Sequence, residues 1–179
     1  MGVPHLSEKP VLFIGALFSD KRIFDGVLPS LKIKFGEILF QSTVHEWPYS
    51  NHYQKEMGTP IYRVFIFFEK IIDPSSIADI KLLTNELEES NSVEGKRMIN
   101  LDPGYLTLAK VVLASTKNYS HRIYVGKGIY AELALLYKNQ QFNSMPYTYN
   151  DYKEDIYVAM FTDIRNILKK RERGGCPKE

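Results

Sequence analysis

The chain has 179 residues, 44% hydrophobic and 25% charged, so it is long enough for a hydrophobic core and too apolar for a disordered protein. Its net charge of +2 falls short of the strongly basic balance of nucleic-acid-binding domains. Its apolar runs are far shorter than the roughly 20 residues that span a membrane as a helix. We therefore expect neither a nucleic acid nor a membrane among its partners.

The first residues predict a strand followed by a helix. Residues 1–10 lack the basic segment, apolar stretch and cleavage site of a targeting signal, so we expect a cytoplasmic protein. The apolar run over 11–18 predicts a buried central strand. Ser19 or Asp20 can cap the next helix, whose apolar residues recur at helical spacing and which Gly36 is placed to end. Pro29 falls inside this helix and is expected to kink or split it.

Two strands and a second helix are predicted next. Residues 37–44 alternate in part between apolar and polar and indicate a strand, and a polar, aromatic loop is expected over 45–60. Residues 61–68, all apolar after Arg63, predict a third strand. Asp73 and Pro74 indicate the start of a helix that ends near Asn91, and residues 96–101 predict a fourth strand.

This order of elements indicates the fold class. Strand, helix, strand, strand, helix, strand is the βαββαβ pattern of the ferredoxin-like α+β fold, in which both helices pack on one face of an antiparallel sheet. We predict such a core, extended by a β-hairpin and a C-terminal helix. With no repeat or linker in the sequence, we expect one domain over residues 1–179, flexible at 1–9 and 173–179.

The segment after the fourth strand fits two structures. Asp102 and Pro103 repeat the cap-and-proline signal, and apolar residues over 106–113 recur at helical spacing. Val111 and Val112 suit a strand equally well. Helix or strand therefore stays open for residues 105–116.

The C-terminal third predicts a hairpin and a last helix. Residues 122–125 and 129–133 flank Gly126, Lys127 and Gly128, which suit a tight turn, and Phe142 is expected on a short further strand. The last helix should begin at Asn150 or Asp151. Its basic end, Lys169, Lys170, Arg171 and Arg173, complements the helix dipole. The single cysteine, Cys176, permits no internal disulfide and suits a reducing compartment.

The first candidate site lies within residues 100–132. A two-residue hairpin turn would place His121 opposite Glu132, and a three-residue turn would place Arg122 there, so a carboxylate meets a base or a cation in either case. His121 with Glu132 is our predicted acid/base pair if catalysis occurs. The residues predicted to bind a ligand are Asn100, Asp102, Tyr105, Lys117 and Arg122. Each residue alone also suits a structural role, and Asp102 in particular suits a helix cap.

The second grouping is the loop over 45–60. His45, Glu46, His52 and Glu56 offer nitrogen and oxygen ligands for a metal, although polar loop residues are more often simply solvated. Trp47 and the loop tyrosines are better explained as a cover for the core or for a ligand. No cysteine and histidine spacing indicates zinc, so we assign no metal, and the sequence identifies no cofactor.

Several strings resemble one bacterial family of unknown function, family number 4416. They are Asn-Leu-Asp-Pro-Gly-Tyr at 100–105, Leu-Ala-Ser-Thr-Lys at 113–117, His-Arg-Ile-Tyr at 121–124, Gly-Ile-Tyr-Ala-Glu at 128–132, and Tyr53 with Glu-Met-Gly at 56–58. The resemblance covers almost the whole chain and implies no known activity. Some members are labelled GTP-binding, but this sequence has neither a phosphate loop nor the guanine-reading Asn-Lys-x-Asp motif.

Two functions are consistent with these observations. The first is a protein that binds, or binds and acts on, a small anionic or nucleotide-like ligand around residues 100–105 and the hairpin. The second is a non-catalytic module that associates with itself, as a homodimer, through an exposed face or edge of its sheet. Convergence of Asp102, His121 and Glu132 on one cleft would favour the first.

Overall fold

The computed structural model describes residues 2–3, 9–49 and 51–174. They form one antiparallel sheet of nine strands, four α-helices and two short 3₁₀ helices. The strands are β1 Val11–Phe18, β2 Ile38–Gln41, β3 His45–Glu46, β4 Tyr62–Ile71, β5 Ile99–Leu106, β6 Lys110–Ser115, β7 Ile123–Gly126, β8 Ile129–Lys138 and β9 Gln141–Ser144. The helices are α1 Lys21–Phe35, α2 Asn51–Met57, α3 Ile77–Ser90 and α4 Asp155–Gly174, with η1 Pro74–Ser76 and η2 Asp151–Lys153.

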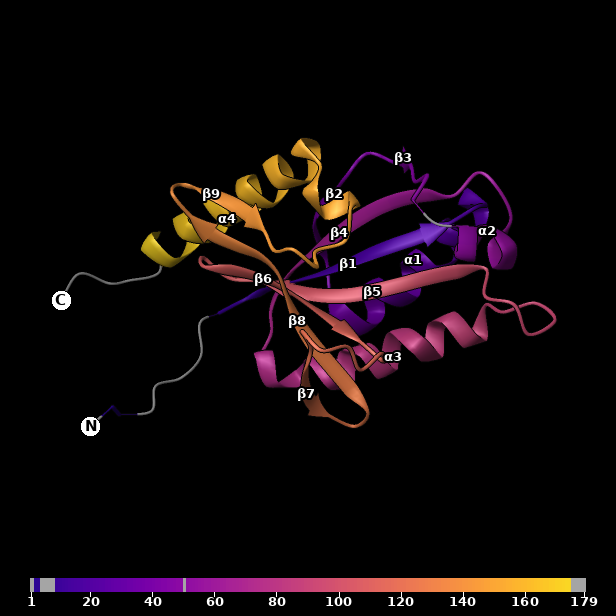
Figure 1. Cartoon of the computed structure of the whole chain (residues 1–179), viewed down its shortest axis with the longest axis horizontal. Coiled ribbons are helices and arrows are strands. Elements are labelled where there is room, and N and C mark those ends of the chain that lie inside the picture. Colours follow the sequence, from indigo (N-terminus) through magenta and orange to yellow (C-terminus); the bar gives the residue numbers. More distant parts are fainter. Residues whose placement is uncertain (1, 4–8, 50, 175–179) are drawn as a thin grey trace.

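The sheet is the middle layer of three. Its strands follow the order β2-β4-β1-β5-β6-β8-β7, while β3 pairs with β4 and β9 with β8. Helices α1 and α3 pack on one face of the sheet and α4 on the other (Figure 1). The α+β class and the antiparallel sheet are therefore confirmed.

Strand β1 explains why its sequence is an unbroken apolar run. Successive strand residues point to opposite faces. Leu12 and Ile14 pack under α1 and α3, whereas Val11 and Phe13 pack under α4. All eight residues of β1 are buried, as predicted for a central strand.

Local signals at helix ends were predicted well. Asp20 is the N-cap of α1 and accepts a hydrogen bond from the Arg22 amide at 2.8 Å, and Gly36 ends the helix with a positive φ of 96°. Pro29 was expected to kink or split this helix. The expected split is wrong, because α1 continues through Pro29. Pro29 lies on the exposed face, where the carbonyl left without an amide partner remains accessible to solvent.

Residues 105–116 are strand and turn. Strand β5 continues through Asp102 and Pro103, so Asp102 caps no helix, and β6 follows after a short turn. In an antiparallel pair, the backbone N–H groups of alternate residues point to the same side. The Leu101 amide points away from β1 and toward Glu88, so the nitrogen of Pro103, two residues later, also points away from β1. No partner strand lies opposite Pro103 there, because the pairing of β5 with β6 begins only at Gly104, so its missing N–H costs no ladder bond.

Strands β5 and β6 separate to form what we call the fork. They pair through three residue pairs, from Gly104 with Leu113 to Leu106 with Val111. Before Gly104, the side of β5 that has no partner strand forms hydrogen bonds with side chains of α3 instead. Glu88 Oε1 accepts from the Leu101 amide at 2.6 Å, and Lys81 Nζ donates to the Leu101 carbonyl at 2.8 Å.

Other predictions have mixed outcomes. The hairpin is confirmed as β7 and β8, and Phe142 lies on β9. The last helix begins at Asp155, after the 3₁₀ turn η2 at residues 151–153. The loop over 45–60 contains β3 and α2. Of the predicted flexible ends, residues 1, 4–8 and 175–179, with Cys176, lie outside the described residues.

Within the described ranges, no helix is both long enough and apolar enough to cross a membrane.

Candidate functional site

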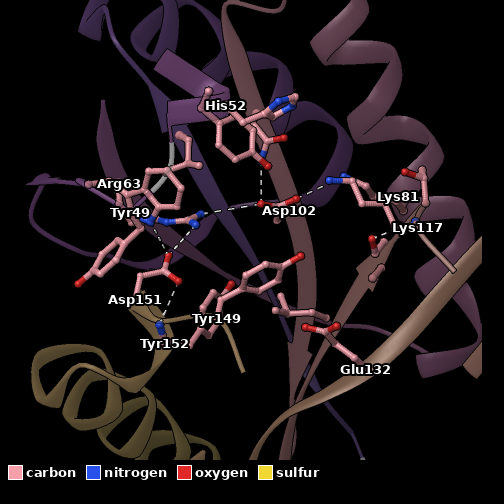
Figure 2. A pocket seen from close by; sticks show the side chains of 18 of the residues that line it. Tyr49, His52, Arg63, Lys81, Asp102, Lys117, Glu132, Tyr149, Asp151 and Tyr152 are labelled. Atoms are coloured by element: carbon pink, nitrogen blue, oxygen red, sulfur yellow. Dashed lines mark hydrogen bonds and ion pairs between the residues drawn. The ribbon is translucent and has the colours of Figure 1, made fainter. Parts of the chain in front are cut away.

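A cavity of about 570 Å³ opens where the fork parts the sheet. Its walls come from the segment after β3 and from α2, from α3, from β6 and β8, and from the segment that leads into α4. Figure 2 shows Asp102 in the middle, with Arg63 and Tyr49 on one side and Lys81 and Lys117 on the other. The cavity thus draws on segments that are distant in the sequence.

The floor is a patch of three adjacent strands. Leu17 of β1 lies between Arg63 of β4 and Asn100 of β5, and Gly15 lies beside Asp102. An ideal Cβ on Gly15 would be 2.9 Å from Arg63 Nη1 and 3.3 Å from the Tyr152 hydroxyl oxygen. Because glycine has no side chain, the Arg63 guanidinium can extend across β1 toward Asp102.

Arg63 is buried and held by Asp151. Its Nη2 is 2.7 Å from Asp151 Oδ2, and the Trp47 indole N–H donates to the same oxygen at 2.9 Å. Burial disfavours the charge of Arg63, but the interactions with Asp151, Tyr152 and Asp102 together outweigh this effect and raise the pKa of Arg63 above its ordinary value. The guanidinium therefore stays charged at any physiological pH.

Asp102 is the partly exposed carboxylate at the centre of the floor. Asn100 Nδ2 donates to its Oδ2 at 2.7 Å. Lys81 Nζ is 3.7 Å from Oδ1, and Arg63 Nη1 is 4.0 Å from Oδ2, both too far for a strong hydrogen bond. Asp102 thus has two cations beside it and acceptor capacity to spare.

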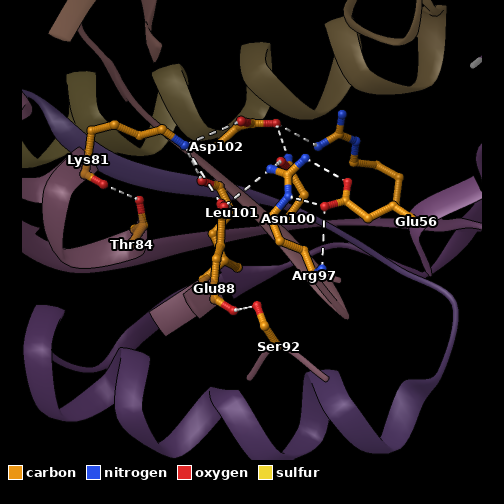
Figure 3. Close-up of polar contacts among 10 residues, drawn as sticks. Glu56, Lys81, Thr84, Glu88, Ser92, Arg97, Asn100, Leu101 and Asp102 are labelled. Atoms are coloured by element: carbon orange, nitrogen blue, oxygen red, sulfur yellow. Dashed lines mark hydrogen bonds and ion pairs between the residues drawn. The ribbon is translucent and has the colours of Figure 1, made fainter. Parts of the chain in front are cut away.

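A network of charges from α3 and the start of β5 supports the floor (Figure 3). Arg97 donates to both carboxylate oxygens of Glu56 at 2.8 Å and to Asn100 Oδ1 at 3.0 Å. Burial raises the pKa of Glu88, whereas Lys81 and the Leu101 amide act to lower it. The hydrogen bond from Arg97 lowers the pKa of Glu56. The network fixes Asn100, and through it the orientation of Asp102.

The opposite wall is built around Arg122. Its Nε donates to Glu132 Oε2 at 2.6 Å, and its other nitrogens donate to the Ser115 hydroxyl, the Lys117 carbonyl and the Tyr149 hydroxyl. Four of the five guanidinium N–H groups are therefore used within the protein. This arrangement fixes Glu132 and Tyr149 at the cavity.

Four buried polar atoms in this region make no hydrogen bond within the described part of the chain. They are Arg63 Nε, Arg63 Nη1, Glu132 Oε1 and the Tyr152 hydroxyl oxygen. Buried polar groups are nearly always paired, and an unpaired one destabilises a protein by about 1–3 kcal/mol. All three residues line the cavity, which makes a polar ligand bound there a candidate partner for these atoms.

The first predicted group is only partly brought together. Asn100, Asp102, Lys117, Arg122 and Glu132 line the cavity. His121 and Tyr105 do not.

The two exceptions have identifiable surroundings. His121 Nε2 is 3.1 Å from Glu132 Oε2, and its ring stacks on Tyr147 at 4.2 Å. Tyr105 packs against the small cluster that α3 forms with Ala114 and Ile129. The two hairpin turns considered from the sequence placed either His121 or Arg122 opposite Glu132. In the structure both side chains contact the same oxygen, Glu132 Oε2.

The second predicted group supplies another wall of the same cavity. Trp47, Tyr49, His52 and Tyr53 line it, so the two groups form one site. Burial raises the pKa of Tyr53, which keeps its phenol neutral. Among the described residues no three histidine, cysteine or carboxylate side chains gather as a metal site would require.

Sequence reasoning missed several lining residues, among them Arg63, Lys81, Asp151 and Tyr152. Arg63 interrupts an apolar strand, and Lys81 and Glu88 fall on the buried side of α3. A charge at a position expected to be buried is the signal that could have indicated them. Asp151 and Tyr152 lie in η2, which no sequence pattern connected to the site.

Fold and site together define an α+β protein with a polar cavity at a fork in its sheet. The chain belongs to the family described as "Domain of unknown function (DUF4416)", whose model matches residues 8–168. Comparison with curated proteins and with solved structures found no significant match.

Proposed function

We propose that the cavity binds a small anionic, nucleotide-like ligand. Trp47, Tyr49, Tyr53 and Tyr149 supply aromatic surface on which a planar base can stack. Lys117 lies exposed at the rim, and its ammonium group forms no hydrogen bond or ion pair with the described residues. It is therefore the cation best placed to receive a phosphate.

One observation carries this proposal: the state of Arg63. The Arg63 guanidinium is buried, and its Nε and Nη1 have no hydrogen-bond acceptor among the residues that the structure describes, an arrangement that is unfavourable in a protein core. It is expected in a binding site, because a ligand can supply the acceptors. The contrast with Arg122, whose donors are largely used by the protein, makes Arg63 the stronger candidate for a ligand contact.

The proposal is tested by a thermal-shift screen with GTP, GMP, AMP, UMP and inorganic phosphate. A ligand that binds only the folded chain must raise its melting temperature. Trp47, the single tryptophan of the sequence, lies in the cavity wall, so a fluorescence titration gives an independent readout. If no nucleotide changes either signal at millimolar concentration, the proposal is wrong.

Replacement of Lys117 by alanine should weaken nucleotide binding by about tenfold, since a charge-assisted hydrogen bond to phosphate contributes at least 1.5 kcal/mol or so. Lys110→Ala is the matched control. Lys110, at the start of β6, is exposed as Lys117 is, but it lies outside the cavity. Dissociation constants from the Trp47 titration provide the comparison. Equal affinity in both variants would remove Lys117 from the site.

Catalysis by His121 and Glu132 stays a prediction. Their contact at 3.1 Å supports a proton-carrying pair, and Glu132, whose Oε1 has no hydrogen-bond partner among the described residues, lines the cavity. Because His121 itself does not line the cavity, we propose that it acts through Glu132 if a reaction occurs.

We further propose that β2-β4-β1-β5, with α1 and α3, is a ferredoxin-like core. The first, second, third and fourth strands of the βαββαβ pattern correspond to β1, β2, β4 and β5. Their spatial order, second-third-first-fourth with antiparallel neighbours, supports the assignment. A cytoplasmic location, which the single cysteine suits, also remains a proposal.

Self-association is the second candidate function. Strand β7 is at the edge of the sheet, and its Ile123 and Tyr124 are 74% and 59% exposed. Unpaired edges with apolar side chains favour pairing with another chain. If β7 forms a homodimer contact, Ile123→Lys should shift sedimentation equilibrium from dimer to monomer and change the free energy of unfolding of the monomer by no more than about 0.5 kcal/mol. A wild-type chain that sediments as a monomer would exclude this function.

A further inference from the structure

We infer that the floor of the cavity binds a neutral, hydroxyl-bearing group, so that the ligand is a ribonucleotide held by its sugar at Asp102. This inference rests on the proposed function and specifies which part of the ligand enters and which stays at the rim. The arrangement around Asp102 suggests this, because the aromatic ring of Tyr49 lies on one side of Asp102 and Lys117 lies on the other (Figure 2).

Arg63 and Asp102 face each other without a direct hydrogen bond. Arg63 Nη1 can only donate a hydrogen bond, and Asp102 Oδ2 can only accept one, yet they are 4.0 Å apart. A hydroxyl group bound beside this pair, within hydrogen-bond distance of both atoms, accepts from the guanidinium and donates to the carboxylate. A phosphate or carboxylate accepts from Arg63 but has no proton for Asp102.

The charges of the inner surface also favour a neutral group. Each of three inner cations lies beside a carboxylate: Arg63 beside Asp151, Lys81 beside Glu88 and Arg122 beside Glu132. Glu132 Oε1 is buried with no donor among the described residues. A hydroxyl donor satisfies this oxygen without adding a charge to the paired set, so an anionic group belongs at the rim near Lys117, whose ammonium group has no ion-pair partner among the described residues.

Two unpaired polar atoms lie over Gly15, where an ideal Cβ would be 2.9 Å from Arg63 Nη1 and 3.3 Å from the Tyr152 hydroxyl oxygen. Both atoms are buried and have no hydrogen-bond partner among the described residues. Arg63 Nη1 and the Tyr152 hydroxyl thus lie close together above the floor. A sugar with vicinal hydroxyl groups can engage both Arg63 and Tyr152, whereas a single hydroxyl engages only one.

The test compares GMP and AMP with their 2′,3′-dideoxy counterparts by calorimetry and by the Trp47 fluorescence titration. Loss of hydroxyls that bond to charged groups should weaken binding by about 10- to 100-fold. In Asp102→Ala, each ribonucleotide should fall toward the affinity of its dideoxy counterpart. Asp163→Ala, which removes an exposed carboxylate of α4, is the matched control and should keep the full discrimination.

The outcomes separate the two proposals. If GMP or AMP binds and its dideoxy counterpart binds equally well, the sugar assignment is overturned while the proposed function stands. If no nucleotide binds the wild-type chain, both are overturned. Discrimination that survives in Asp102→Ala would overturn the role of Asp102. The wild-type comparison needs no variant, so it decides the sugar assignment even if Asp102→Ala does not fold.

Discussion

Replacement of Lys81 by methionine should lower the free energy of unfolding by about 3–5 kcal/mol, as expected when one partner of a buried ion pair is removed. The side chains of Lys81 and Glu88 are 7% and 6% exposed and lie 3.8 Å apart. Methionine has a similar shape but leaves Glu88 with Arg97 Nη1, 3.4 Å away, and without the buried ammonium of Lys81. It also leaves the Leu101 carbonyl without its donor. Urea denaturation followed by circular dichroism measures the loss.

The pH dependence of this loss tests its origin. Burial already raises the pKa of Glu88, and Lys81 opposes that rise. Without Lys81 the pKa rises further, so Glu88 takes up a proton at a higher pH in the folded variant and its buried charge disappears. The difference from wild type should therefore be largest near pH 8 and shrink toward pH 5. A loss that is equal at both values would contradict the ion-pair explanation.

A double variant gives the matched control. Glu88→Gln keeps an oxygen that can accept from the Leu101 amide but has no charge. Lys81→Met combined with Glu88→Gln should therefore recover part of the stability lost in Lys81→Met alone. No recovery would show that the bond from Lys81 to the Leu101 carbonyl, and not the uncompensated charge, dominates the effect.

Gly104→Ala is expected to have the other large effect, a loss of about 3 kcal/mol. An ideal Cβ at Gly104 would lie 2.4 Å from the Val112 carbonyl oxygen and 2.5 Å from the Phe13 ring. The oxygen belongs to the backbone of β6, and Gly104 begins the pairing of β5 with β6. Relief of the clash must therefore disturb the short ladder that closes the fork.

Gly26→Ala is the control for this substitution. Gly26 lies within α1, and nothing lies within 4 Å of the position of its Cβ. Alanine favours the helix by about 0.8–1 kcal/mol over glycine, so this variant should be more stable than wild type. Melting temperatures should thus move in opposite directions for the two changes. A stable Gly104→Ala variant would show that β5 and β6 can separate without loss.

The sequence predicted what depends on neighbouring residues. The strand of residues 11–18, the caps at Asp20 and Asp73 and the end of α3 near Asn91 all follow from local patterns, and the structure confirms them. The helix signal at Asp102 and Pro103 was misleading because it ignores what lies opposite a strand. A proline is tolerated in β5 only since β6 diverges there, and that is a tertiary fact.

The site could be predicted only in part for a related reason. Conspicuous polar residues in the loop and the hairpin were found as two separate groups, because no periodicity relates Trp47 to Glu132. Lys81 falls on the buried face of α3, but no pattern in the sequence shows the partner that its charge would meet there. Its role depends on the Leu101 carbonyl, which has no partner in β6 because β5 and β6 have separated at that point.

The indole of Trp47 and the carboxylate of Asp151 are joined across 104 positions of the chain, and the remaining walls come from segments between them. No short stretch can therefore reproduce the cavity, and an occupant would contact five strands, β1, β4, β5, β6 and β8, together with α2, α3 and η2. Amide hydrogen exchange should then slow on both layers of helices and along the central strands, not at one loop. A small molecule that raises the melting temperature in the thermal-shift screen would therefore stabilise the entire chain and protect it against proteolysis.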